Sequence, residues 1–125
     1  LYNCALNPLG AVMEVAYGQL SDSPSWSIIR RVIEEAFAVC EAEEIALPWK
    51  SAQEYLACLR TVQLPATAGH HSSMLQDLRQ GRETEIDFLN GAVVRLGARH
   101  GIPTPTNQTL VDLIKFKTLL KAKRS

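Results

Sequence analysis

Apolar side chains recur at intervals of three and four residues along most of this chain. The clearest series consists of Trp26, Ile29, Ile33, Phe37 and Cys40. This spacing puts them on one face of an α-helix, so it predicts a helix over about 26–46 that packs inside the domain rather than against a second copy. On the other face, opposite charges four residues apart, such as Arg31 and Glu35, favour the same helix.

The same periodicity predicts further helices on both sides of this one. Their approximate ranges are 1–16, 51–61, 73–80, 84–100 and 105–121. Ser23 and Pro24 are typical of a helix start, and residues 62–71 are expected to be irregular. No segment shows the alternation of apolar and polar residues that is typical of a half-buried strand. The sequence therefore predicts an all-α, multi-helix fold and a single domain over residues 1–125.

Helix-start signals are concentrated between residues 72 and 107. Ser73 and Gln76 have the spacing of a capping box, in which each side chain satisfies an unpaired amide of the first turn. Thr84 precedes acidic residues in a first turn, where the helix dipole favours them. Thr104 stands before a proline at the first helical position. These signals predict that two short helices meet at a polar junction near Gly81.

Some residues are expected to disturb these helices. Pro8 cannot donate an amide hydrogen bond, so it should start a new turn or kink the first helix. Gly91 and Gly97 each cost about 1 kcal/mol in helix propensity relative to alanine. The usual compensation for such glycines is the close approach of another helix, which we expect here.

Composition excludes several classes of partner. The chain has 13 basic and 13 acidic side chains, which argues against a nucleic-acid partner. No apolar run approaches membrane length and no signal peptide is visible, so no membrane partner is expected. Three widely spaced cysteines are typical of reduced thiols in a cytoplasmic protein. His70 and His71 are adjacent and lack a nearby carboxylate or cysteine, so no metal site is expected.

Polar side chains suited to a small polar ligand occur at both ends of the chain. Asn3 and Asn7 lie four residues apart, so they share one face of the first helix. The remaining candidates are Ser73, Asp77, Glu85 and Asn90. Amides and hydroxyls are neutral hydrogen-bonding groups, and a carboxylate can orient a cation or act as acid or base. From the residues alone, the same cluster could equally consist of helix caps, and no nucleophile–base pair is evident.

Two motifs carry a family resemblance. NCALNPLGA begins at residue 3, and SSMLQDLRQGRETEIDFLNG, followed by GIPTPTN, begins at residue 72. Together they resemble the signature of the ketopantoate reductases (2-dehydropantoate 2-reductases). The resemblance implies an all-helical C-terminal domain like that of 6-phosphogluconate dehydrogenase relatives. The Rossmann domain that binds NADPH would be absent from this chain, which contains no GxGxxG sequence.

The resemblance also implies an activity and a set of site residues. The whole enzyme would reduce ketopantoate to pantoate in pantothenate (coenzyme A) biosynthesis, with a lysine as general acid. That lysine would be the second residue upstream of Leu1. Asn3, Asn7 and Ser73 resemble substrate-binding residues, and Glu85 resembles the catalytic glutamate that orients the lysine and the nicotinamide end of the cofactor. Tyr17 and His70 stand where well-studied members have substrate-side asparagines.

Three functions remain open at this point. The first is the C-terminal domain of a ketopantoate reductase, whose partners would be a 2-oxo acid, its own Rossmann domain and, in a homodimer, a second copy. The second is a family member that reduces another 2-oxo acid, which the changes at Tyr17 and His70 favour. The third is a helical interaction module without catalysis. The chain alone is expected to be inactive, because the hydride donor and the general acid lie outside it.

Overall fold

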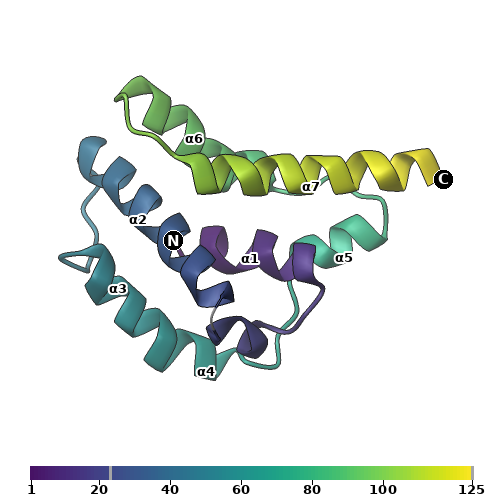
Figure 1. Ribbon diagram of the computed structural model, residues 1–125, viewed down its shortest axis with the longest axis horizontal. Coiled ribbons are helices and arrows are strands. Elements are labelled where there is room, and N and C mark those ends of the chain that lie inside the picture. Colours follow the sequence, from purple (N-terminus) through teal and green to yellow (C-terminus); the bar gives the residue numbers. More distant parts are fainter. Residues whose placement is uncertain (23, 125) are drawn as a thin grey trace.

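The computed structural model describes residues 1–22 and 24–124 as helices joined by short connections (Figure 1). These described ranges contain no β-strand, so the predicted all-α fold is confirmed. The longer helices are α1 (Tyr2–Met13), α2 (Ser25–Ala42), α3 (Ala52–Cys58), α5 (Ser73–Arg79), α6 (Asn90–Arg99) and α7 (Pro105–Arg124). The shorter elements are η1 (Tyr17–Ser21), η2 (Leu59–Gln63), α4 (Leu64–Ala66) and η3 (Ile86–Phe88). Ser23, expected to open α2, lies outside the described residues.

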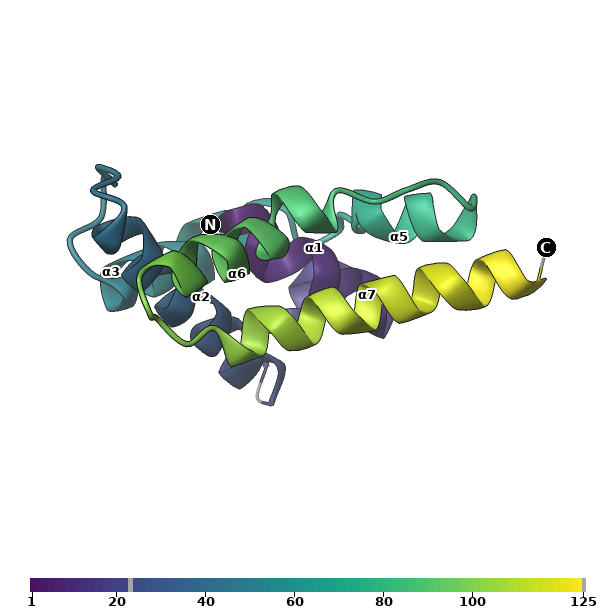
Figure 2. The same cartoon turned by 90° about the horizontal axis from the view of Figure 1, so that it is seen from above.

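Helix α1 occupies the centre of the arrangement. It packs against α2, α5 and α7, while α3 and α4 lie on the opposite side from α7 (Figure 1). The C-terminal half of α7 extends beyond the end of α1 and runs past α5 (Figure 2). Because α1 contacts so many elements, a side chain on its surface meets residues from distant parts of the sequence.

The apolar face of α2 packs internally, as predicted. Ile29, Ile33 and Phe37 are buried against α1 and α3, whereas Trp26 and Cys40 at the ends of the series are half-buried. A second group of buried side chains joins α1, α5, η3 and α7. It consists of Ala11, Met74, Leu75, Leu78, Ile86, Val111 and Ile114. The segments on either side of the polar junction near Gly81 are therefore anchored in the same core.

Three predicted helix ends are wrong, and the first is that of α2, which ends at Ala42 rather than near residue 46. Helix α1 stops at Met13, because Glu14 adopts a left-handed conformation with φ 56° and donates its amide to the Gly10 carbonyl. The helix that begins at Ala52 continues through η2 and α4 to residue 66, where an irregular segment was expected. Leu59 and Leu64 are both buried, yet five residues separate them, which does not suit one α-helical face. The π turn of η2 changes the register between them, so both reach the core.

The continuous helix predicted over 84–100 is also wrong. The structure has the short η3 first, then a break at Leu89 with φ −105° and ψ −98°, and only then α6. This break lets Ile86 enter the core while Asn90, at the first position of α6, is fully buried. The Thr84 hydroxyl accepts the Ile86 amide at 3.4 Å, although Glu85, and not Thr84, is the N-cap residue of η3.

Pro8 lies inside α1 without ending the helix. A proline has no amide hydrogen, so the Cys4 carbonyl one turn earlier loses its helical donor. Asn90 replaces that donor, because its Nδ2 lies 3.1 Å from the Cys4 oxygen. The same Nδ2 donates to Asn107 Oδ1 at 2.8 Å, which links α1, α6 and α7. The expected new turn at Pro8 is therefore avoided through a contact from another helix.

Glu35 has a different partner from the one predicted. Its carboxylate accepts the amides of Thr106 and Asn107, both at 3.0 Å, and the Asn107 side chain at 2.9 Å. It therefore caps the first turn of α7, in place of the expected pair with Arg31. The neighbouring i,i+4 pair, Arg30 with Glu34, does form at 2.9 Å on the exposed face.

Candidate functional site

Three segments meet around the side chain of Asn7, which is 8% exposed on α1. The Tyr17 hydroxyl, from η1, donates a hydrogen bond to Asn7 Oδ1. The Ser72 hydroxyl, which precedes α5, donates to the Asn7 backbone carbonyl at 2.7 Å and lies 3.4 Å from Oδ1. The first family-like motif is thus joined to the second across 65 residues of sequence.

Tyr17 is held on both its backbone and its ring. Its amide donates to the His70 carbonyl at 2.9 Å, and its ring packs edge-on against Tyr2 with centroids 6.1 Å apart. Burial raises the pKa of Tyr17 to about 12, although a hydrogen bond with Ser72 acts in the opposite direction. The hydroxyl is therefore neutral at physiological pH and able to donate a hydrogen bond.

Ser72, not Ser73, caps α5. The Ser72 Oγ accepts the amides of Met74 at 3.1 Å and Leu75 at 3.3 Å, and the residue is fully buried. The predicted capping role of Ser73 is therefore wrong: Ser73 is the first residue of the helix and is exposed. Local propensity does not distinguish two adjacent serines, since only the contact with Asn7 selects one of them. Ser73 consequently keeps its hydroxyl on the surface.

The other predicted site residues lie on neighbouring elements. Asn3 is exposed one turn before Asn7 on α1, and His70 is exposed beside Tyr17. Glu85 is exposed at the start of η3, where its backbone carbonyl accepts the Phe88 amide at 2.9 Å. The structure therefore brings Asn7, Tyr17 and His70 together by direct contacts. No hydrogen bond or ion pair within the described residues joins the Asn3 or Glu85 side chain to that group.

Two further polar candidates serve the fold. Asn90 is buried in the hydrogen-bond network that completes α1. Asp77 pairs with Arg82 at 3.2 Å across the Gly81 turn. Both side chains bind other residues of the domain, whereas the exposed candidates Asn3, Ser73 and Glu85 face solvent.

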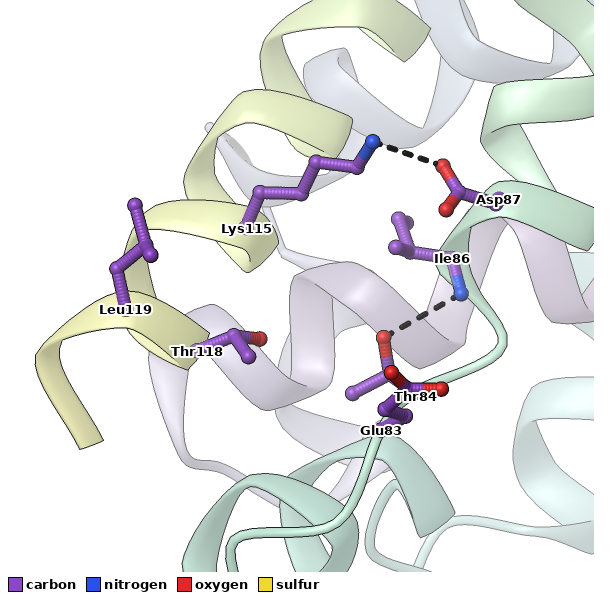
Figure 3. Close-up of a pocket in the computed structure, with 7 residues that line it drawn as sticks. All are labelled: Glu83, Thr84, Ile86, Asp87, Lys115, Thr118 and Leu119. Atoms are coloured by element: carbon purple, nitrogen blue, oxygen red, sulfur yellow. Dashed lines mark hydrogen bonds and ion pairs between the residues drawn. The ribbon is translucent and has the colours of Figure 1, made fainter. Parts of the chain in front are cut away.

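Two hollows on the described surface are lined by residues other than the predicted site residues. One, of about 350 Å³, lies between η3 and α7, and there Lys115 Nζ is 3.0 Å from Asp87 Oδ1 (Figure 3). The other, of about 590 Å³, lies between α1, α2 and α7 and is mainly apolar, with Met13 and Leu113 among its exposed side chains. Neither is lined by Asn3, Asn7, Ser73 or Glu85.

The described part of the chain has few features of other site classes. Across residues 1–22 and 24–124, no group of three or more His, Cys, Asp or Glu side chains is arranged to hold a metal ion. The three cysteines are free thiols, and burial raises the pKa of Cys4 and of Cys40. None of the described helices combines the length and apolar character that a membrane crossing requires.

Comparison with known proteins agrees with the motifs. Residues 1–118 match the family described as ketopantoate reductase PanE/ApbA C terminal. A 2-dehydropantoate 2-reductase of Aquifex aeolicus is 45% identical over 124 residues, which are 98% of this chain and 40% of that protein. One from Vibrio cholerae is 42% identical over 113 residues, covering 90% of this chain and 37% of that protein. The chain thus spans about 40% of the length of the curated relatives it matches.

Solved structures give the same result. A PanE/ApbA family ketopantoate reductase from Ralstonia eutropha superposes with a TM-score of 0.85 at 34% identity, covering 97% of this chain and 39% of that one. A D-mandelate dehydrogenase, solved with NADH and anilino(oxo)acetate, superposes with a TM-score of 0.84 at 31% identity, again covering 97% and 39%. With the helical fold, the joined motifs and these similarities in agreement, the chain belongs to the ketopantoate reductase family and matches its C-terminal domain.

Proposed function

We propose that this chain is the substrate-binding domain of an NADPH-dependent 2-dehydropantoate 2-reductase. The observation that carries the proposal is the contact between the two family motifs, in which the Ser72 hydroxyl donates to the Asn7 carbonyl at 2.7 Å. Ser73, the next residue, is exposed at the start of α5, the helix that packs against α1. The 45% identity with the Aquifex aeolicus enzyme over nearly the whole chain supports the same activity.

In the proposed reaction, the keto carbon of ketopantoate gains a hydride and the keto oxygen gains a proton. NADPH, which a Rossmann domain would mainly hold, would supply the hydride, and the lysine expected upstream of Leu1 would supply the proton. Asn3, Asn7 and Ser73 hold the polar groups of the substrate through neutral hydrogen bonds. Glu85 orients the lysine, because a carboxylate favours and directs a neighbouring ammonium.

The exposed residues of η3 fit the nicotinamide end of such a cofactor. Glu85 is exposed, and Phe88 on the same short segment is 79% exposed. A carboxylate accepts hydrogen bonds from a carboxamide N–H, and an aromatic side chain offers an apolar surface to a planar ring. The role of Glu85 at the cofactor therefore agrees with the chemistry of the groups that this chain exposes.

The test uses the full-length protein, NADPH and ketopantoate, with oxidation of NADPH followed by absorbance. Turnover is expected, and its absence in a folded protein would sink the proposal. Glu85→Gln should lower kcat about 100-fold, in the range of a lost acid–base or orienting group. Glu83→Gln is the matched control, since Glu83 is an exposed acid two residues away, and its kinetics should equal those of the wild type.

A second candidate activity is the reduction of a different 2-oxo acid. The similarity to D-mandelate dehydrogenase, solved with NADH and a 2-oxo acid derivative, favours it. So do Tyr17 and His70, which differ in size and reach from the asparagines of well-studied ketopantoate reductases. A panel of ketopantoate, phenylglyoxylate and smaller 2-oxo acids, each with NADPH and NADH, separates the two activities by kcat/KM.

The third reading, a helical interaction module without catalysis, makes the opposite prediction for the sequence upstream of Leu1. A lysine two residues upstream, preceded by a GxGxxG-containing βαβ region, would eliminate it. For the chain alone, we expect no reduction of ketopantoate and no tight binding of NADPH in titration calorimetry. Tight NADPH binding by the isolated chain would contradict the proposal that a separate Rossmann domain holds the cofactor.

A homodimer of the full-length protein is also proposed. The apolar hollow between α1, α2 and α7 supports it, because Met13 and Leu113 at this surface are 55% and 40% exposed. Apolar side chains gathered in one hollow are typical of an association surface. Sedimentation velocity should give twice the protomer mass for the wild type and the protomer mass for Leu113→Glu. A wild-type monomer at high concentration would count against this surface as an interface.

A further inference from the structure

The orientation of the Asn7 side-chain amide is fixed from one side. Its Oδ1 accepts the Tyr17 hydroxyl, and the Ser72 hydroxyl lies 3.4 Å from the same oxygen. An asparagine amide has one acceptor atom and one donor atom, so the hydrogen bond from the Tyr17 hydroxyl to the oxygen determines where the nitrogen points. Among the described residues, none accepts a hydrogen bond from Asn7 Nδ2.

This nitrogen is not sealed inside the core. Asn7 is 8% exposed, and the fully buried side-chain polar atom without a partner in the described residues is a different one, Asn90 Oδ1. Asn7 Nδ2 therefore has no acceptor among the described residues and is not among their fully enclosed polar atoms. Neighbouring Ser73 and Asn3 are exposed as well, so the donor lies among other polar groups.

Gly10 makes room for the ring that fixes this amide. A Cβ added at Gly10 would lie 3.1 Å from Tyr17 Cε1 and 3.4 Å from Ser72 Cβ. The tyrosine ring thus lies against the backbone of α1, one turn beyond Asn7. On its other side, the Tyr17 and Gly18 amides donate to the carbonyls of His70 and Ala68, both at 2.9 Å. The main chain at Tyr17 is therefore held by the 68–70 segment, while the ring packs against α1 at Gly10.

We propose that Tyr17 is a positioning residue, which acts through Asn7 and presents Asn7 Nδ2 as a fixed donor to an acceptor oxygen of the 2-oxo acid. The proposal rests on the proposed function and deepens it. Tyr17 does not touch the substrate, because its hydroxyl is already committed to Asn7 and the residue is only 5% exposed. A fixed donor selects substrates that place an oxygen opposite it and rejects those that do not.

The alternative arrangement of the amide would reverse this selection. If Asn7 were turned so that its oxygen faced outward, the site would offer an acceptor and repel a carboxylate. The Tyr17 hydroxyl remains protonated throughout the range in which an enzyme of this kind is assayed, because burial raises its pKa to about 12. The orientation of the Asn7 amide is therefore independent of pH over that range.

The test is a double-mutant cycle in the full-length enzyme. Tyr17→Phe removes the hydroxyl and keeps the ring, so KM for the preferred 2-oxo acid should rise about tenfold, with kcat changed less than threefold. In an Asn7→Ala background, the same Tyr17→Phe change should leave KM unchanged, because Tyr17 affects substrate binding only through the Asn7 side chain. An equal rise in KM in both backgrounds, or no rise in the wild-type background, would overturn the proposal.

Two further variants separate positioning from general loss of stability. Tyr55→Phe is the matched control, since Tyr55 is also buried and its hydroxyl donates to Gln63 Oε1 at 2.8 Å, away from Asn7. It should leave KM at the wild-type value. Gly10→Ala keeps every hydroxyl but displaces the Tyr17 ring, and it should raise KM in the same direction as Tyr17→Phe. An unchanged KM in Gly10→Ala would contradict the role assigned to the ring.

A measurement that needs no turnover distinguishes failure of the proposed function from failure of the positioning role of Tyr17. In ¹⁵N-labelled protein, the two side-chain amide proton signals of Asn7 should shift in Tyr17→Phe and keep their positions in Tyr55→Phe. If they shift but no 2-oxo acid is reduced by the wild type, the proposed function fails and the hydrogen bond stands. If they do not shift, Tyr17 does not position Asn7, whatever the enzyme reduces.

Discussion

The Asn90 side-chain amide donates a 3.1 Å hydrogen bond to the Cys4 carbonyl, the group that Pro8 deprives of its helical donor. This contact explains how a proline is tolerated in the middle of the central helix. The contact lies between residues 3 and 7 of α1, which carry the two candidate substrate-binding amides. A residue of α6 therefore supports the helix segment on which these amides lie.

Asn90→Ala should lower the free energy of unfolding by about 2–3 kcal/mol, because the buried oxygens of Cys4 and Asn107 both lose their donor. Urea denaturation measures the change. Gln108→Ala removes an exposed amide that bonds Asp112 and should cost less than about 0.5 kcal/mol. A small effect of Asn90→Ala would mean that the Cys4 carbonyl finds another donor.

The link between Asn90 and Pro8 can be tested separately. Pro8→Ala restores a backbone amide for the Cys4 carbonyl, so Asn90→Ala should cost less in the Pro8→Ala background than in the wild type. The expected difference is about 1 kcal/mol, the net value of one hydrogen bond. Additive effects of the two substitutions would show that the two residues are not energetically coupled.

Glu35→Ala should destabilise the protein by about 1–3 kcal/mol, because the first amides of α7 lose their acceptor. Glu34→Ala is the matched control, since Glu34 is adjacent and forms only an exposed ion pair with Arg30. Such pairs contribute between zero and about 1 kcal/mol. Thermal unfolding of both variants, compared at one pH, decides whether the carboxylate at position 35 acts as a cap.

Gly97→Ala should cost about 1–3 kcal/mol, because the added Cβ would lie 2.9 Å from Thr104 Cγ2 and 3.3 Å from Val39 Cγ2 of α2. The close approach of another helix expected at this glycine is thus present. Gly69→Ala has no neighbour within 4 Å and should be neutral or slightly stabilising. Equal stability of the two variants in urea would mean that α6 and α2 separate easily.

Alkaline pH should destabilise the fold through its buried tyrosines. Burial raises the pKa of Tyr17 from 10.0 to about 12, and it raises that of Tyr55 further. The unfolded chain loses these protons first, so stability is fully present below pH 10 and falls as pH rises toward about 12. Tyr17→Phe should make this fall shallower in urea titrations. An identical pH profile for the variant would show that Tyr17 ionises normally in the folded protein.

The apolar spacing of the sequence predicted the helices well, because burial of one face is a local property of each segment. The series from Trp26 to Cys40 became α2, and the final helix began at Pro105 as its cap signals indicated. Three of the errors share one cause. The choice of Ser72 over Ser73, the break at Leu89 and the use of Glu35 as a cap each depend on a contact with a distant segment.

Part of the candidate site was located from the sequence, while the roles of its residues stay predictions. The family resemblance named Asn7, Tyr17 and His70, which the fold brings together, and the family comparison identified the domain. Asn3, Ser73 and Glu85 are exposed, so their roles depend on groups that the packing of this chain does not supply. Sequence reasoning missed Gly10 and Ser72. The sequence does not show that Gly10 packs against the Tyr17 ring, or that Ser72 rather than Ser73 accepts the first amides of α5.

The hydrogen bond from Asn90 also constrains the order in which the protein matures on the ribosome. Its partners are 86 residues apart, so α1 is synthesised long before the donor that completes it. The nascent chain must therefore carry an incomplete first helix until α6 has emerged, when the buried Cys4 thiol becomes protected. Pulse labelling of stalled chains with a thiol reagent should show that Cys4 is reactive in chains whose residue 90 is still inside the ribosome. Cys4 should be protected in longer chains, from which residue 90 has emerged.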